Sequence, residues 1–207
     1  MRILEQRFFR RPRVLNQLHR VGLVRATSQT TVEELAALGR FAVGARTALE
    51  IGTYQGVSAA CIAKVMAADS ALYCVDPWPE VDGRPNPCWL ICERHLRRVG
   101  RLENVRILRG RSADVEHLLP DSLDFVFVDG DHSWGGIETD WQILCRRLVT
   151  GGIVCLHDAV VPPDETWRQP DSVRFYQNIV AKDTSFEKLA VVHTLAVLRK
   201  VHLPFGR

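Results

Sequence analysis

Short apolar runs that alternate with helical segments place the strongest constraint on the fold of this chain. The run Leu123–Val128 contains Phe-Val-Phe-Val, which is the composition of a buried strand. Similar runs predict strands at 47–51, 71–75, 105–108 and 153–156. Helical patterns separate these runs, and such alternation is typical of βαβ units with helices on both faces of a parallel sheet.

We therefore predict an α/β fold with a doubly wound, mostly parallel sheet of seven strands. The last two strands come from β-like runs at 186–192 and 195–201, which His193 and Thr194 join into an antiparallel C-terminal hairpin. A chain of 207 residues is long enough for one domain of this kind with a short extension.

The extension is expected at the N-terminus. Residues 1–25 hold seven arginines and one acid, whereas the whole chain has a net charge of +3, so the rest is mildly acidic. Leu15 and Leu18 have helical spacing with other apolar residues of this segment and need a surface to cover. We predict a basic helical arm over 1–30, a domain over 31–207, and contact of the arm with the body or with a second subunit.

Composition excludes several classes of protein. No window approaches the roughly 18 uninterrupted apolar residues that span a bilayer, and the basic start has no apolar stretch behind it, so we expect neither a membrane partner nor a secretory signal. Three of the six cysteines lie inside apolar runs, which favours a reducing compartment and a cytoplasmic location. Because the basic charge is confined to the arm, nucleic acid is not the expected partner.

Polar and glycine-rich segments follow the predicted strands. Ligands of doubly wound sheets bind at the carboxyl ends of the strands, so the functional residues are expected directly after each apolar run. These segments are Gly52–Gly56, Asp76–Trp78, Gly110–Ser112, Asp129–His132 and His157–Asp158.

The first of these segments predicts a nucleoside site. In Glu50-x-Gly52-x-x-x-Gly56 the glycines allow a ligand to approach the backbone closely, and the helix that follows offers unpaired N–H groups to an anionic group. Asp76, after the next strand, is placed to accept hydrogen bonds from ribose hydroxyls. Dinucleotide-binding sheets share these features, but this chain lacks the Gly-x-Gly-x-x-Gly pattern of a pyrophosphate site.

The acid-x-Gly-x-x-x-Gly turn resembles the first motif of class I methyltransferases that use S-adenosylmethionine. Segments 125–134 and 151–158 are similar to the strand-four and strand-five motifs of methyltransferase domain family 24, which comprises bacterial small-molecule methyltransferases. The resemblance covers about residues 45 to 160 and implies a Rossmann-like methyltransferase fold with S-adenosylmethionine as cofactor. The cofactor-binding residues that it implies are Glu50, Gly52, Thr53, Tyr54, Gly56, Ser58, Asp76, Trp78, Ser112 and Asp129, with Trp78 packed on the adenosine and Ser112 at the adenine edge.

The ends of the fourth and fifth strands are expected to form the reacting end, because neighbouring strands bring their polar residues together. His132 is a candidate general base, with Asp129 and His157 as further catalytic residues. Related catechol-type enzymes bind magnesium through carboxylates at these positions, which implies a divalent cation, Mg or Mn, on Asp129, Asp158 and His157. The histidine departs from that pattern, since nitrogen is a poor ligand for magnesium.

These observations favour a methyltransferase that acts on a hydroxyl of a small-molecule acceptor, such as a sugar or a natural product. Two alternatives stay open at this point. One is N-methylation of RNA or a small amine, which only the basic arm favours. The other is a nucleotide-binding module without catalysis.

Overall fold

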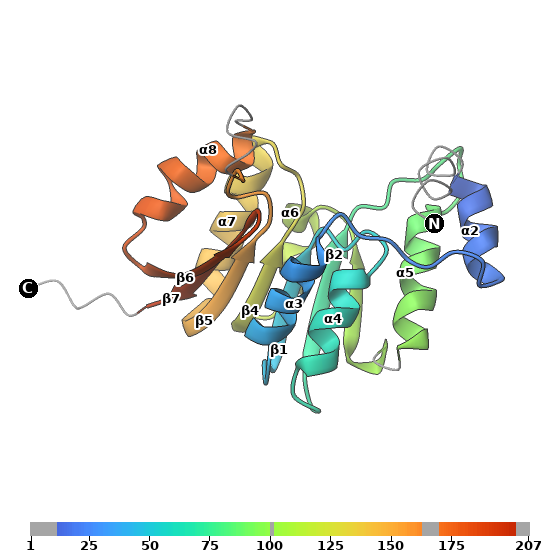
Figure 1. Ribbon diagram of the computed structural model, residues 1–207, viewed down its shortest axis with the longest axis horizontal. Coiled ribbons are helices and arrows are strands. Elements are labelled where there is room, and N and C mark those ends of the chain that lie inside the picture. The colour runs from blue at the N-terminus through green and yellow to red at the C-terminus, as the bar shows by residue number, and fades with distance from the viewer. Residues whose placement is uncertain (1–11, 100–101, 163–169, 202–207) are drawn as a thin grey trace, which may run out of the picture.

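The computed structural model describes residues 12–99, 102–162 and 170–201 (Figure 1). Seven strands form one sheet in the order β3-β2-β1-β4-β5-β7-β6. The first five strands are parallel, whereas β7 is antiparallel to both β5 and β6. The predicted mostly parallel sheet with a C-terminal hairpin is confirmed. The strands are β1 Thr47–Ile51, β2 Ala71–Asp76, β3 Val105–Arg109, β4 Leu123–Val128, β5 Leu148–Leu156, β6 Phe186–Val192 and β7 Leu195–Lys200.

Helices cover both faces of the sheet. Residues of α3, α4 and α5 pack on one face, and residues of α6, α7 and α8 pack on the other. No helix within the described ranges has the length and apolarity that a bilayer crossing requires. The helices are α2 Pro12–Arg20, α3 Val32–Phe41, α4 Val57–Val65, α5 Pro87–Arg98, α6 Ser112–Val115, α7 Trp134–Arg147 and α8 Asp171–Asn178, with 3₁₀ turns at Leu102–Asn104, Glu116–Leu118 and Val180–Lys182.

Strand β4 shows why the predicted strands are continuous apolar runs. Phe125 and Phe127 point into the core layer beneath α3, α4 and α5, whereas Val126 and Val128 point into the layer beneath α7 and α8. Successive side chains of a strand face opposite sides, so a strand covered on both faces needs apolar residues at every position.

Strand β5 differs from the prediction. It begins at Leu148 instead of Ile153, directly after α7, which ends at Arg147. Leu148 already pairs with Leu123, and the register between the two strands shifts before Ile153 pairs with Phe125. Gly151, with a positive φ of 85°, lies in this irregular stretch, and glycine adopts that backbone conformation without a steric penalty.

Helix α2 lies along α5 (Figure 1). Leu15 is 4% exposed and packs with Val24 and Ile91, and the Arg94 guanidinium donates to the carbonyl of Asn16 at 3.3 Å. The arm therefore contacts the body through this helix. Residues 1–11 of the predicted arm lie outside the described residues, and the domain boundary at residue 30 and a role of the arm in oligomer formation stay predictions.

We expect Leu15→Ala to lower the free energy of unfolding by about 2–5 kcal/mol, because it leaves a cavity between α2 and α5. Val14 lies on the same helix but is 37% exposed, so Val14→Ala is the matched control and should change stability little. Urea unfolding of both variants measures the difference. Equal losses would mean that α2 does not stabilise the folded chain through Leu15.

Candidate active site

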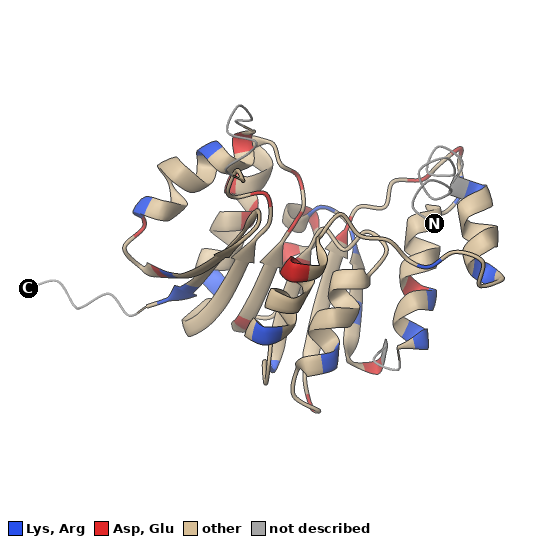
Figure 2. Cartoon of the chain, viewed as in Figure 1, with Lys and Arg blue, Asp and Glu red and all other residues tan. Residues whose placement is uncertain are grey.

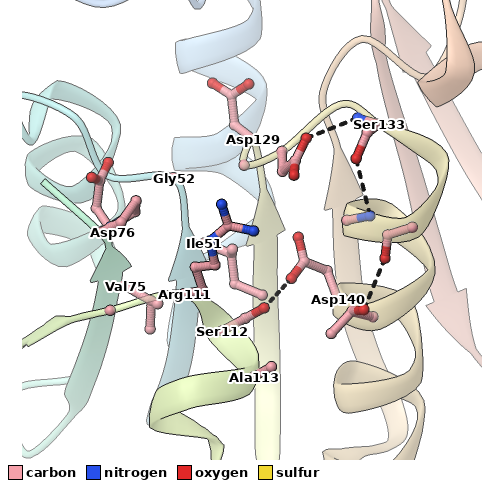
Figure 3. A pocket seen from close by; sticks show the side chains of 17 residues that line it. Ile51, Gly52, Val75, Asp76, Arg111, Ser112, Ala113, Asp129, Ser133 and Asp140 are labelled. Carbon is pink, nitrogen blue, oxygen red and sulfur yellow. Dashed lines mark hydrogen bonds between the residues drawn. The ribbon is translucent and has the colours of Figure 1, made fainter. Parts of the chain in front are cut away.

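A cavity of about 670 Å³ lies beyond the carboxyl ends of β1, β2 and β4 (Figure 3). Asp76 lies on one side of it and Asp140, from α7, on the opposite side. We call it the large cavity. Its walls come mainly from the segments that follow the strands, as the sequence predicted, and include Gly52, Asp76, Ser112, Asp129, Ser133 and Asp140.

Gly52 occupies a position that no other residue fits. Its φ is +93°, and a Cβ there would lie 1.9 Å from the carbonyl oxygen of Asp129. The N–H of Gly52 donates to Val75 at 2.8 Å, and the N–H of Asp129 donates to Ile51 at 2.8 Å. The ends of β1, β2 and β4 are therefore fixed to one another at the floor of the large cavity.

Gly56 begins the helix that follows the turn. It is the N-cap of α4, has a φ of 77° and provides no side chain to cap the first N–H groups. A Cβ at Gly56 would lie 2.9 Å from the Sγ of Cys92. The helix start is therefore close-packed on α5 and keeps N–H groups for an anionic ligand.

Asp76 ties the glycine turn to the segment after β2. Its carboxylate accepts the N–H of Tyr54 at 2.8 Å and the N–H of Trp78 at 2.9 Å. Burial raises the pKa of Asp76, although both N–H donors oppose that shift. The carboxylate lines the large cavity and retains lone pairs for a ligand hydroxyl.

The position of Trp78 corrects one expectation. Its side chain is 1% exposed, and its indole N–H donates to the carbonyl of Tyr54 at 2.8 Å. Trp78 packs in the core next to α4 and α5 and is not among the residues that line the large cavity. The indole therefore supports the glycine turn from below instead of packing on an adenosine.

A second cavity of about 200 Å³, the turn cavity, adjoins the glycine turn. Thr53, Tyr54 and Ser58 line it, together with Asp129 and His132. It shares Gly52, Asp76, Asp129 and Gly130 with the large cavity, so the two are adjacent compartments.

Glu50 lies beneath the turn and lines neither of these cavities. Its side chain is fully buried, and burial raises the pKa of its carboxyl to about 7, against the opposing effects of Ser58, Thr53 and Cys74. Glu50 is therefore placed to support the turn, not to contact a ligand of the large cavity directly.

Asp140 is a residue of the large cavity that sequence reasoning missed. The Ser112 hydroxyl donates to its carboxylate, and Asp140 is 3% exposed (Figure 3). The only sequence signal is its place on the buried face of α7, three and four residues before Ile143 and Leu144. A carboxylate on such a face indicates either a hydrogen-bonded core acid or a ligand contact.

Asp140 predicts a pH dependence of stability. Burial raises its pKa to about 6, above its ordinary value of 3.8, so between these values the folded state binds more protons than the unfolded state. The free energy of unfolding should therefore fall as pH rises from about 4 to 6, by roughly 3 kcal/mol from this group. In Asp140→Asn this contribution is absent, so urea unfolding at several pH values should give a flatter profile. Parallel profiles for the variant and the wild type would contradict the assignment.

A third cavity, also about 200 Å³, lies beyond β4 and β5, and we call it the histidine cavity. His132 and Gln29 line both this cavity and the turn cavity, so they form a shared wall. Other lining residues of the histidine cavity are Glu34, His157, Asp158, Val173, His193 and Thr194.

Five side chains form a connected cluster at this place, one from α3 and four from the segments that directly follow β4 and β5. Asp129 Oδ1 lies 3.3 Å from His132 Nε2 and 3.0 Å from His157 Nδ1. The outer nitrogens of both imidazoles face further carboxylates: His132 Nδ1 lies 3.3 Å from Asp158 Oδ2, and His157 Nε2 lies 3.3 Å from Glu34 Oε2. The predicted catalytic residues Asp129, His132 and His157 are thus brought together.

The cluster holds three carboxylates around two imidazoles, and this charge shifts their pKa values. Burial by itself lowers the pKa of His157, but Asp129 and Glu34 outweigh it and raise the pKa to about 10. Asp129 also raises the pKa of His132. Burial raises the pKa of Asp129, but both imidazoles outweigh it and lower the value. The cluster therefore requires positive charge, from protons or from a cation.

Glu34 is the second residue that sequence reasoning missed as part of the site. It lies in the first turn of α3 and forms a capping box with Thr31. Its fully buried carboxylate also accepts the N–H and the hydroxyl of Thr194, at 3.0 and 2.7 Å, from the turn between β6 and β7. The contact spans 160 positions of the chain, so no local pattern could reveal it.

The magnesium set implied by the resemblance does not fit these residues. Magnesium takes oxygen ligands, whereas the group of side chains that lies close enough to share an ion in the described part of the chain, Asp129, His132 and His157, offers one oxygen and two nitrogens. Asp158, expected as a ligand, lies near both imidazoles, since its Oδ2 is 3.3 Å from His132 Nδ1 and 3.7 Å from His157 Nδ1. The expected set of Asp129, Asp158 and His157 therefore stays a prediction, and its histidine nitrogen suits manganese better than magnesium.

The sheet order with its reversed hairpin, and the cavities along its carboxyl edge, are those of a class I methyltransferase. The model of a methyltransferase domain family, family 24, matches residues 49–159, which is more than half of the chain. The chain belongs to this family. Among curated proteins, no sequence matches.

Solved structures agree with this assignment of the fold. Cofactor-bound Rv0187 from MTB is 17% identical, with a TM-score of 0.70 over 91% of this chain and 89% of that chain. The O-methyltransferase TomG from Streptomyces achromogenes, involved in tomaymycin synthesis and solved with SAM, is 20% identical, with a TM-score of 0.65 over 92% and 89%. An O-methyltransferase from Bacillus cereus in complex with SAH is 21% identical, with a TM-score of 0.63 over 92% and 89%.

Proposed function

We propose that this protein transfers a methyl group from S-adenosylmethionine to a hydroxyl of a small molecule, such as a sugar or a natural product. The observation that carries the proposal is the shared wall: His132 faces both the compartment beside the glycine turn and the histidine cavity. A methyl donor in the first compartment and an acceptor in the second would meet at the cluster of Asp129 and His132.

The cofactor would extend across the two adjacent compartments. The ribose hydroxyls would bind Asp76, and the adenine would lie beside Ser112 and Asp140 in the large cavity. The methionine part would lie in the turn cavity, where the start of α4 offers N–H groups to its carboxylate. The bound SAM and SAH of the TomG and Bacillus cereus structures support this choice of cofactor.

The acceptor would occupy the histidine cavity, whose apolar wall includes Val160, Val161 and Val173. Methyl transfer to oxygen needs a hydroxyl that loses its proton in or before the transition state. His132 would accept the proton of the hydroxyl as its oxygen bonds to the methyl carbon, and S-adenosylhomocysteine would leave. Asp129 lies 3.3 Å from His132 and would stabilise the protonated imidazole.

Ligand-dependent stability tests the cofactor. We expect S-adenosylhomocysteine to raise the melting temperature and NAD to leave it unchanged. The reason is that the turn after β1 lacks the Gly-x-Gly-x-x-Gly pattern that binds the pyrophosphate of NAD. Asp76→Ala should weaken binding by about 1.5–3 kcal/mol, the loss expected for a hydrogen bond to a charged group. Equal stabilisation by NAD would contradict the proposal.

Transfer of labelled methyl from S-adenosylmethionine to a panel of phenols, sugars and amines tests the reaction. Labelled ether products support the proposal. Labelled amines or RNA would instead support N-methylation, and cofactor binding without any labelled product would support a nucleotide-binding module.

A further inference from the structure

We propose that Glu34 is a positioning residue of the candidate active site. It holds the imidazole of His157 in place, and that imidazole in turn holds the carboxylate of Asp129 beside His132. This role rests on the proposed function, because Glu34 would act on methyl transfer only through those side chains. Glu34 lies outside residues 49–159, so the part of the chain that matches the family does not include it.

The carboxylate of Glu34 is itself held from two directions. The side chain is 1% exposed. Its Oε2 accepts the N–H and the hydroxyl of Thr31 at 2.8 and 2.9 Å, and its Oε1 accepts the same two groups of Thr194 at 3.0 and 2.7 Å. Hydrogen bonds to a carboxylate favour its ionised form. Glu34 is therefore a negative charge with a fixed position in the folded chain.

The imidazole of His157 lies between this fixed charge and the carboxylate of Asp129. Its Nε2 is 3.3 Å from Glu34 Oε2, and its Nδ1 is 3.0 Å from Asp129 Oδ1. The side chain is 6% exposed, and Phe127 lies edge-on to the ring, with 6.3 Å between the ring centroids. A flipped ring would turn carbon atoms toward both carboxylates. Glu34 and Asp129 together therefore determine the orientation of this ring.

The carboxylate of Asp129 connects His157 to His132. Its Oδ1 faces both rings, since it also lies 3.3 Å from His132 Nε2. His132 lines the turn cavity and the histidine cavity, where the methyl donor and the acceptor would meet. If His157 were displaced, Asp129 would keep only the contact with His132, and its carboxylate would be free to turn away from that ring.

A capping role alone does not account for the burial of Glu34. Charged side chains are rarely fully buried unless they are paired. The neighbouring Glu33 lies in the same first turn of α3 and is exposed, as a residue that serves only the helix can be. Glu34 uses the same oxygen, Oε2, for the cap at Thr31 and for the contact with His157. The cap and the active-site contact are therefore combined in one carboxylate.

Nuclear magnetic resonance of the histidine rings tests the contact without an acceptor. In the full chain, labelled with ¹⁵N-histidine and treated with a chelator, we expect Glu34→Gln to change the ring nitrogen shifts of His157, because an uncharged amide replaces the carboxylate at Nε2. The spectrum of His157→Ala assigns the resonances by their loss. Glu33→Gln removes the same charge from the exposed position and should leave these shifts unchanged.

Unchanged His157 shifts in folded Glu34→Gln would overturn the proposal. If that variant does not fold, Glu34→Asp keeps the charge but withdraws it from the ring by the length of one methylene group. It should change the same shifts, and unchanged shifts in this variant would overturn the proposal equally.

Kinetics separates positioning from stability. With an acceptor found among the labelled products, Glu34→Gln should lower kcat by about 10²-fold, the usual cost of a misplaced reacting group, and leave the KM for S-adenosylmethionine near that of the wild type. Leu15→Ala destabilises the chain outside the site and should keep the wild-type kcat at a temperature where it is folded. Equal losses of kcat in the two variants would show that stability alone is responsible and would overturn the proposal.

The same samples separate this proposal from the proposed function. Stabilisation by S-adenosylhomocysteine together with full kcat in Glu34→Gln would overturn the positioning role alone. Changed His157 shifts without any stabilisation of the wild type by S-adenosylhomocysteine would support the hold of Glu34 on His157 and contradict the methyltransferase reaction.

Discussion

The substitution Gly52→Ala is expected to lower the free energy of unfolding by about 2–5 kcal/mol and to abolish binding of S-adenosylhomocysteine. The left-handed backbone costs a residue with a Cβ about 1–2 kcal/mol, and forcing an extra carbon into a packed site costs about 1–3 kcal/mol more. The overlap at Gly52 is with the carbonyl of Asp129 at 1.9 Å, and a backbone atom cannot move away as the end of a flexible side chain does. Relief requires the ends of β1 and β4 to separate.

Gly44 provides the matched control. It also has a positive φ, +75°, but a Cβ there meets no atom within 4 Å. Gly44→Ala should therefore show only the left-handed cost of about 1–2 kcal/mol and should bind S-adenosylhomocysteine normally. Urea unfolding and calorimetric titration of both variants measure the difference. Similar losses of unfolding free energy in the two variants would show that the close approach of Gly52 to Asp129 does not contribute to stability.

The variant His132→Ala is expected to lower kcat by about 10²–10⁴-fold. This factor is the usual contribution of a general base that removes a proton from the acceptor. His132 lines the turn cavity and the histidine cavity, but it does not line the large cavity, where the ribose and the adenine would bind. Binding of S-adenosylhomocysteine should therefore be largely retained. Single-turnover kinetics with saturating cofactor separates loss of chemistry from loss of binding.

Chelator treatment tests which chemistry the cluster supplies. If the cluster acts through an ion, the chelator should abolish turnover of the wild type and Mn²⁺ should restore it. Turnover that the chelator leaves unchanged but that His132→Ala lowers would indicate a general base. Full activity in both experiments would show that the cluster takes no part in the reaction. Orientation of the acceptor beside the methyl donor would then be the remaining source of catalysis.

The fold was largely predictable because its central strands are buried on both faces. That burial requires apolar residues at the four consecutive positions from Phe125 to Val128 of β4, and the same composition makes the strand recognisable in the sequence. The start of β5 was not predictable, since the pairing of Leu148 with Leu123 depends on a register shift that local composition does not encode.

The candidate site was predictable where its residues lie at the carboxyl ends of strands. Gly52 and Asp129 directly follow β1 and β4, Asp76 ends β2, and parallel strands bring these ends to one edge. Glu34 and Asp140 come from helices, and their contacts depend on how those helices pack on distant segments. The buried orientation of Trp78 was not predictable either, because it follows from a backbone with a positive φ of 33°.

The contact of Glu34 with Thr194 also governs when the site can form during synthesis. The carboxylate of Glu34 is fixed by a turn that is synthesised 160 positions later. Synthesis proceeds at about 5–20 residues per second from the N-terminus, so Asp129 and His157 are available seconds before the hairpin that fixes Glu34. A nascent chain that stops before β7 therefore contains every predicted catalytic side chain but lacks the hairpin turn that holds Glu34 against His157.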